Sequence, residues 1–258
     1  MSDIESATQH PRAGFWRRFG AALIDALVVT VPIQLVVVVL FAMTNGAIQT
    51  GTGIAFNNCL HIVPITQLPN DLNPPPPQGA NSAVICRTSF FGLETARRLI
   101  VSRVTRDGIV TKTYSRTYML DADSHQTDGT SLDWFAFVAL AIYLIALEHR
   151  FGATVGKHLL GLRVAETLDA QRVGVSLRRA VVRNVMIWLG VLPMMIVAFG
   201  DFVLSRGDPE AFWTGGFFAW FMAAGLLGMV WYLWVAIQVA RKRDPIYDRI
   251  AGTAVLRG

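Results

Sequence analysis

Four stretches of this chain are almost free of charged side chains and approach the length needed to cross a lipid bilayer. They run from about Phe19 to Met43, Trp134 to Leu147, Val181 to Leu204 and Gly215 to Val239. A transmembrane helix needs about 20 apolar residues, because the hydrocarbon core is roughly 30 Å thick. The pattern predicts an all-α membrane bundle with four transmembrane helices. The second stretch is short, so a buried or re-entrant helix is the alternative interpretation there.

The few charged residues, 16% of the chain, predict its orientation in the membrane. Lysine and arginine cluster before the first stretch, between the second and third, and after the fourth, whereas Arg206 is the only base between the third and fourth. Because cytoplasmic loops carry the excess of bases, we expect both termini in the cytoplasm. The net charge of +5 does not indicate a nucleic-acid partner, since the bases lie in short clusters beside apolar runs.

The long connection between the first and second stretches is predicted to lie outside the cytoplasm. Within it, two β-favouring runs, Leu99–Val104 and Ile109–Tyr114, are separated by Arg106-Asp107-Gly108, which is a hairpin signal. We therefore expect a small β-rich or irregular extracytoplasmic insertion. The chain then divides into an N-terminus with the first helix, this insertion, and three further helices with a basic connector and tail: residues 1–43, 44–132 and 133–258.

Both cysteines of the chain, Cys59 and Cys86, fall in this insertion. Disulfides form and persist in oxidising compartments, so we expect the two to pair. In the loop-entropy model such a bridge stabilises the insertion by roughly 3–4 kcal/mol. Two unpaired thiols are the alternative.

Asp25 is the one charged residue within the first apolar stretch. A carboxylate at membrane depth costs about 2.5–3.5 kcal/mol on insertion scales, so it should face the protein interior and find a partner. Arg18 stands seven residues earlier on nearly the same helix face, and Arg183 begins the third stretch. Asp25 either fixes helix packing through an ion pair or forms a cation or proton site.

Three segments of the chain, taken together, resemble the RDD family of bacterial membrane proteins, which is named for one arginine and two aspartates. The first segment, Gly14–Asp25, holds Arg18 and Asp25 as the family arginine and first aspartate. The third, Tyr247–Val255, holds Asp248 as the second aspartate. The second segment runs from Thr154 to Val164, and its matching residues are Thr154, Gly156, Lys157, Gly161 and Arg163.

The resemblance covers the apolar stretches and cytoplasmic segments, residues 10–43 and 133–258, and implies a bacterial cytoplasmic (inner) membrane. We expect Arg18, Asp25 and Asp248 to form one charged cluster near Arg183 or the Gly156–Arg163 connector. Lys157 and Arg163 are expected to meet lipid phosphates. The alternative is that all three segments serve the folding of the cytoplasmic face.

Two functions follow as expectations. Some members of the family have been proposed as sodium/proton antiporters, so the first is transport of a small cation coupled to protons, with Asp25 as the titrating site. The second is a non-transporting membrane module for assembly, sensing or envelope maintenance. We find no catalytic constellation, metal-ligand spacing or cofactor motif, so an enzyme is not expected. The expected partners are the lipid bilayer and either a second copy of the chain or another membrane protein.

Overall fold

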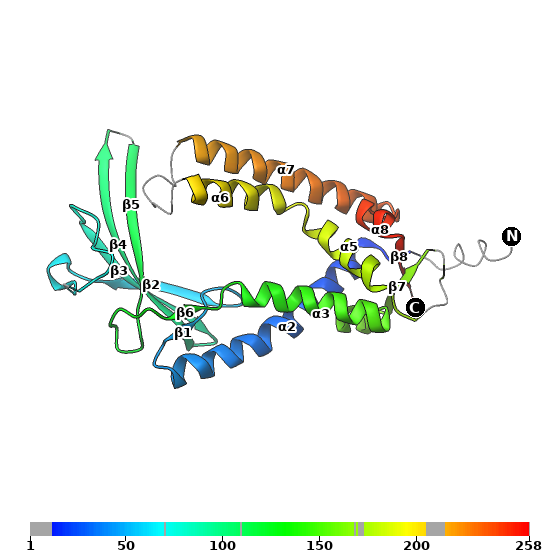
Figure 1. The fold of residues 1–258 in the computed structure, drawn as a ribbon, viewed down its shortest axis with the longest axis horizontal. Helices are drawn as coiled ribbons and strands as arrows, with labels where there is room; N and C mark the ends of the chain where they lie inside the picture. The colour runs from blue at the N-terminus through cyan, green and yellow to red at the C-terminus, as the bar shows by residue number, and fades with distance from the viewer. Residues whose placement is uncertain are drawn as a thin grey trace. The chain divides into compact units, whose positions relative to one another are not determined.

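The structure is a computed structural model that describes residues 12–69, 71–108, 110–167, 169, 173–204 and 215–257. The chain divides into two compact units, a helical unit of residues 1–29 and 139–258 and a sheet unit of residues 30–138. Helices α2 (Phe15–Met43) and α3 (Phe135–Phe151) each run from one unit into the other (Figure 1). The predicted loop that carries Arg206 lies outside the described residues.

The prediction of an all-α bundle with four transmembrane helices is wrong. About 48% of the chain is helical and 25% is strand, arranged in several sheets. Within the described part of the chain, two helices, α2 and α7 (Gly215–Ala240), are long and apolar enough to cross a membrane. A third span exists only if α5 (Leu177–Trp188) and α6 (Leu192–Leu204), which are bent by 68°, count as one.

Two physical reasons account for the smaller number of spans. Helix α3 has only 17 residues, which extend about 26 Å at roughly 1.5 Å per residue. The third apolar stretch breaks between α5 and α6, where Pro193 stands in the first turn of α6, a position that tolerates its missing N–H. At Gly190, a Cβ atom would lie 2.6 Å from the Tyr232 ring of α7, so only glycine allows this approach.

The second and third of the family-like segments, Thr154–Val164 and Tyr247–Val255, fold into short elements of the helical unit. These are α4 (Val155–Leu159), β7 (Leu162–Glu166), α8 (Ile246–Ala251) and β8 (Thr253–Arg257). Strands β7 and β8 pair antiparallel, and Ala21 of α2 and Ala13, which precedes α2, pack in one apolar cluster with them. Ala13 N donates to Val255 O at 3.2 Å, and Arg12 forms an ion pair with Asp244. The first described residues therefore lie directly against the C-terminal segment.

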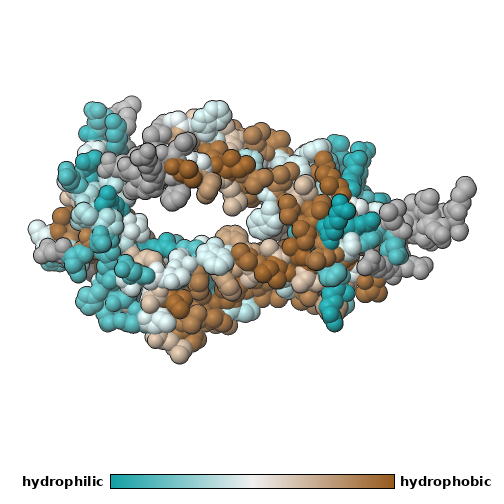
Figure 2. All heavy atoms as spheres, viewed as in Figure 1, coloured by the Kyte–Doolittle hydropathy of each residue, from teal (hydrophilic) through white to brown (hydrophobic). Residues whose placement is uncertain are grey.

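The long helices carry their apolar side chains outward. On α7, Trp220 is 70% exposed and Leu227 is 64% exposed. Figure 2 shows hydrophobic residues over the helices and hydrophilic residues over much of the sheet unit. Such apolar exposure is expected of helices that face lipid rather than water.

The sheet unit is built on a four-stranded antiparallel sheet in the order β2-β3-β4-β5 (Figure 1). Its strands are β2 (Phe56–Ile62), β3 (Ser82–Phe90), β4 (Leu93–Asp107) and β5 (Val110–Met119). A separate parallel pair joins β1 (Ile48–Gln49) to β6 (Thr130–Ser131), and one turn of 3-10 helix, η1, spans Ile65–Gln67.

Two sequence predictions within the sheet unit are confirmed. Asp107 pairs with Val110 across the β4–β5 turn, so the Asp-Gly signal does form a hairpin. Cys59 and Cys86 form a disulfide between β2 and β3. The unit also has its own apolar core of buried residues, made by Leu72, Ala83, Leu99, Val101, Tyr118 and Leu120.

Candidate functional site

Asp25 is buried on α2 with 1% of its surface exposed, and three neutral donors hold its carboxylate. Tyr143 of α3 donates its hydroxyl to Oδ1 at 2.9 Å, and Thr154 donates its hydroxyl to Oδ2 at 2.5 Å. The backbone N–H of Gly156, in the first turn of α4, donates to Oδ1 at 2.7 Å. Among the described residues, no lysine or arginine lies within ion-pairing distance of Asp25.

The Thr-x-Gly sequence explains why α4 can lie so close to α2. A Cβ atom at Gly156 would stand 2.1 Å from the backbone oxygen of Ala21, so a larger residue would push α4 away. Thr154 caps α4 by accepting a hydrogen bond from the backbone N–H of Lys157 at 3.4 Å. The same hydroxyl donates to Asp25, so a single threonine both starts α4 and docks it on α2.

Asp248, at the start of α8, is fully buried and lies between two arginines. Arg18 Nη1 donates to its Oδ2 at 2.9 Å, and Arg183 Nε donates to its Oδ1 at 2.6 Å. The Thr253 hydroxyl adds a longer hydrogen bond of 3.3 Å. This aspartate therefore joins α2, α5 and α8.

Glu148, near the end of α3, is the third buried carboxylate, with 1% of its surface exposed. Arg183 Nη1 and Lys157 Nζ each donate to its Oε1 at 2.5 Å. Asn184 Nδ2 approaches Oε2 at 3.5 Å. Arg183 thus bridges two carboxylates, Glu148 and Asp248.

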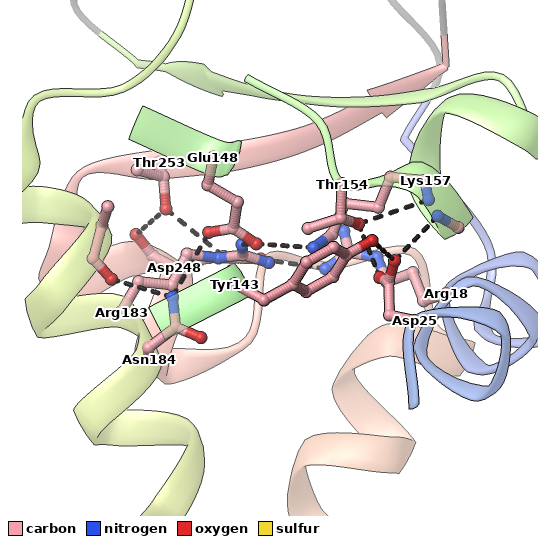
Figure 3. A network of polar contacts seen from close by, with 12 residues as sticks. Arg18, Asp25, Tyr143, Glu148, Thr154, Lys157, Arg183, Asn184, Asp248 and Thr253 are labelled. Carbon is pink, nitrogen blue, oxygen red and sulfur yellow. Dashed lines mark hydrogen bonds and ion pairs between the residues drawn. The ribbon is translucent and has the colours of Figure 1, made fainter. Parts of the chain in front are cut away.

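We call these residues the charge network; it is made by Arg18, Asp25, Tyr143, Glu148, Thr154, Lys157, Arg183, Asn184, Asp248 and Thr253 (Figure 3). Its three cationic side chains equal its three carboxylates in number. A buried charge is tolerated when it is paired and hydrogen-bonded. Glu148 and Asp248 are both paired and hydrogen-bonded, whereas Asp25 is held by hydrogen bonds from neutral donors alone.

A cavity of about 260 Å³ lies beside the charge network within the helical unit. Arg18, Asp25, Glu148, Lys157 and Arg183 line one part of it. The remaining wall is mostly apolar and is contributed by side chains of α2, α3, α5 and α7.

The structure brings most of the predicted site residues together, although Asp25 has other partners than the arginines expected from the sequence. Arg18, Arg183 and Asp248 form direct ion pairs, whereas Asp25 is held by Thr154 and Gly156. We expected arginine to compensate Asp25, and the neutral donors correct that expectation.

Lipid contacts are expected for two residues of the connector, Lys157 and Arg163. The ammonium group of Lys157 pairs with Glu148, and its side chain is 13% exposed. Arg163 lies on β7 with its Nε buried and without a hydrogen-bond partner in the described part of the chain. Gly161 adopts a φ of +63°, which favours glycine, at the turn into β7.

Four members of the network were not among the site residues predicted from the sequence: Tyr143, Glu148, Asn184 and Thr253. Glu148 directly follows an apolar stretch, and we interpreted it only as the polar end of a span. Tyr143 lies inside that stretch, where a tyrosine is also common as a packing residue. An acid placed next to a stretch too short to cross a bilayer was the available signal for Glu148.

Neither a comparison with curated proteins nor one with solved structures finds a match to this chain. The family model described as RDD family matches residues 96–252, about three-fifths of the chain. The matched range includes the Thr154–Val164 segment and Asp248, and the second aspartate lies in the charge network with the arginine of the first helix. With its apolar helices and this arrangement of motif residues, the chain belongs to the RDD family of membrane proteins.

Proposed function

We propose that this protein is a non-transporting membrane module in which the charge network acts as a structural lock. The observation that carries the proposal is the state of the three carboxylates: each is buried and bound by donors fixed on other elements. A cation carrier needs a carboxylate that can exchange its partners. In this network the partners of Asp25 include a backbone N–H, which cannot move aside without shifting α4.

The lock joins segments that are far apart in the sequence. Asp25 fixes α4 on α2, Glu148 ties α3 to α5, and Asp248 ties α8 to both α2 and α5. Helices in lipid gain little from burying apolar side chains against one another, so polar contacts contribute more to their specific association. The helical unit is then a stable base for the sheet unit.

The location that we propose is the bacterial cytoplasmic membrane, with both termini in the cytoplasm. The contact of Arg12 with Asp244 supports placing both ends of the chain on one side of the membrane. Arg17 lies in the first turn of α2 and Lys242 follows α7, as expected for cytoplasmic flanks. The disulfide of the sheet unit supports an oxidising outer compartment for that unit. Assembly, sensing or envelope maintenance through the sheet unit fits this arrangement.

Coupled transport of a small cation and protons is the second candidate. It is favoured by the cavity, which Asp25 and Glu148 both line. A path that reached these carboxylates from both sides of the membrane would let them titrate in turn.

Ion-driven proton flux in proteoliposomes separates the two candidates. The full chain is reconstituted with an internal pH dye, and an inward sodium or potassium gradient is applied. We expect no flux above that of empty liposomes. A cation-dependent flux that is lost in folded Asp25→Asn protein would overturn the proposal in favour of transport.

The topology has its own test. A reporter that is active only outside the cytoplasm, fused after Gly258, should stay silent. The same reporter inserted in the β4–β5 turn after Gly108 should be active, and the reverse pattern would contradict the proposed orientation.

A further inference from the structure

The cavity of the helical unit combines a charged end with apolar walls. At 260 Å³ it is large enough for roughly nine water-sized groups at about 30 Å³ each. Its apolar wall includes Ala22, Leu140, Leu144, Ile187, Trp231 and Val235. A cavity that is polar at one end and apolar elsewhere fits a small amphipathic molecule better than a hydrated ion.

The charged end of the cavity presents cations and conceals carboxylates. The side chains of Arg18 and Lys157 are 11% and 13% exposed, whereas those of their partners Asp248 and Glu148 are 0% and 2% exposed. Asp25 is likewise 1% exposed. Three cationic side chains line the cavity against two carboxylates, because Asp248 lies behind the lining. The surface that a ligand would meet is therefore positive.

A second observation points independently to an acceptor in the ligand. The indole Nε1–H of Trp231 is buried and has no hydrogen-bond acceptor among the described residues, and Trp231 lines the cavity. Buried donors in native proteins are almost always paired with protein, water or ligand. A ligand oxygen in the cavity would satisfy this one.

We propose that the cavity binds a small monoanion with an apolar body, of the chemical class of short-chain carboxylates. The carboxylate lies at the positive end beside Arg18 and Lys157, and the hydrocarbon part lies along the apolar wall formed by Leu140, Leu144 and Val235. A cation is disfavoured there because the accessible groups are already positive. The inference does not depend on the structural-lock function, since the network remains intact around the ligand.

Binding to the purified full chain in phosphatidylcholine nanodiscs tests the proposal. Hexanoate is the probe, and hexanamide and hexylammonium are neutral and cationic analogues of the same length. We expect saturable binding of hexanoate by calorimetry, with affinity at least tenfold higher than for either analogue. At ten times its Kd, hexanoate should raise the unfolding midpoint by roughly 3–6 °C. Equal or tighter binding of hexylammonium, or no saturable binding of hexanoate, would overturn the proposal.

Two variants test whether hexanoate binds in this cavity, and neither replaces a residue of the charge network. Ala22→Leu fills the cavity from an exposed position on α2, so it should abolish hexanoate binding while leaving the protein folded. Trp231→Phe keeps the ring and removes the unpaired N–H, and should weaken binding several-fold, whereas Trp220→Phe, at a position 70% exposed on α7, should not. Unchanged binding in Ala22→Leu would show that hexanoate binds elsewhere and would refute the site.

A carboxylate ligand of this class could reach the cavity from the aqueous phase or from the membrane. Oleate incorporated in the nanodisc distinguishes the two sources, because a fatty acid dissolved in the bilayer would place only its head in the cavity. Competition of oleate with hexanoate identifies a membrane amphiphile as the ligand; hexanoate binding that oleate does not affect identifies a soluble acid. Either result supports the carboxylate site.

Discussion

The sheet unit joins its strands through backbone ladders, a disulfide and an apolar core, whereas the helical unit is tied together by the six charged side chains of the charge network. In water, burying leucine and valine drives a sheet together. In lipid, the same side chains gain nothing by leaving the surface, and on α7 they remain exposed. Because of this difference, we expect the helical unit to be destabilised mainly by the loss of ion pairs and the sheet unit mainly by the loss of its disulfide.

The largest effect is expected from Asp248→Asn. Removing this carboxylate leaves Arg18 and Arg183 buried without full compensation, and breaking a buried ion pair costs about 3–5 kcal/mol. Hydrogen exchange measured by mass spectrometry in nanodiscs should rise in α5 and α8 and stay unchanged in β3 and β4.

Asp244→Asn is the matched control, because Asp244 lies on the same segment and pairs with Arg12 at the surface. Exposed pairs contribute about 0–1 kcal/mol, so the control should change little. Equal effects of the two substitutions would mean that the charge network does not hold the helical unit together.

The disulfide should give the next largest effect, confined to the other unit. Cys59 and Cys86 are 27 residues apart, so replacing both by serine should cost the sheet unit roughly 3–4 kcal/mol in the loop-entropy model. Exchange should increase in β2 and β3 and remain unchanged in α5 and α8. A loss of protection in the helical unit would contradict the separation of the two units.

Asp25→Asn should have a smaller effect than Asp248→Asn. The donors to Asp25 are neutral, so the substitution leaves no arginine uncompensated and disturbs only hydrogen bonds with Thr154, Tyr143 and Gly156. We expect a cost of about 1–3 kcal/mol, seen as faster exchange in α4. A loss as large as that of Asp248→Asn would mean that Asp25 carries charge compensation after all.

The sequence was informative where structure depends on neighbouring residues. The Asp107-Gly108 turn and the two cysteines are local signals, and a resemblance to a family placed Arg18, Thr154, Gly156 and Asp248. The partners of Asp248 lie 230 and 65 residues away, and neither apolar periodicity nor charge spacing specifies such contacts. Glu148 was missed for this reason.

The number of spans was predicted wrongly because apolar composition does not specify helix continuity. Gly190 and Pro193 interrupt the third stretch, and both were visible in the sequence as signals of a break. The 17-residue length of α3 was less visible, since its ends depend on where the sheet unit stops and where the Glu148 contacts begin.

The smallest expected effect is a loss of stability of the sheet unit in acid. Burial acts to raise the pKa of Asp133, but hydrogen bonds from Ser131, Gly51, Thr50 and Arg98 outweigh it and hold the pKa below its ordinary value of 3.8. A carboxylate with a lowered folded pKa stabilises the fold above its ordinary pKa, and that contribution is lost as the pH falls through the folded value.

This contribution of Asp133 should be full at pH 5, begin to fall near pH 4, and disappear as the pH drops through the lowered pKa of the folded protein. Because a third of the side chain is exposed, solvent screens its ion pair with Arg98, and the loss should stay below about 1 kcal/mol. Unfolding midpoints of wild type and Asp133→Asn, measured from pH 6 to pH 2, isolate this residue from the other carboxylates of the unit. The two curves should be separated at pH 6 and converge in acid, because the protonated aspartate and the asparagine are both neutral. A separation that does not change with pH would mean that Asp133 acts through packing and not through its charge, and the sheet unit would then depend on buried polar contacts as the helical unit does.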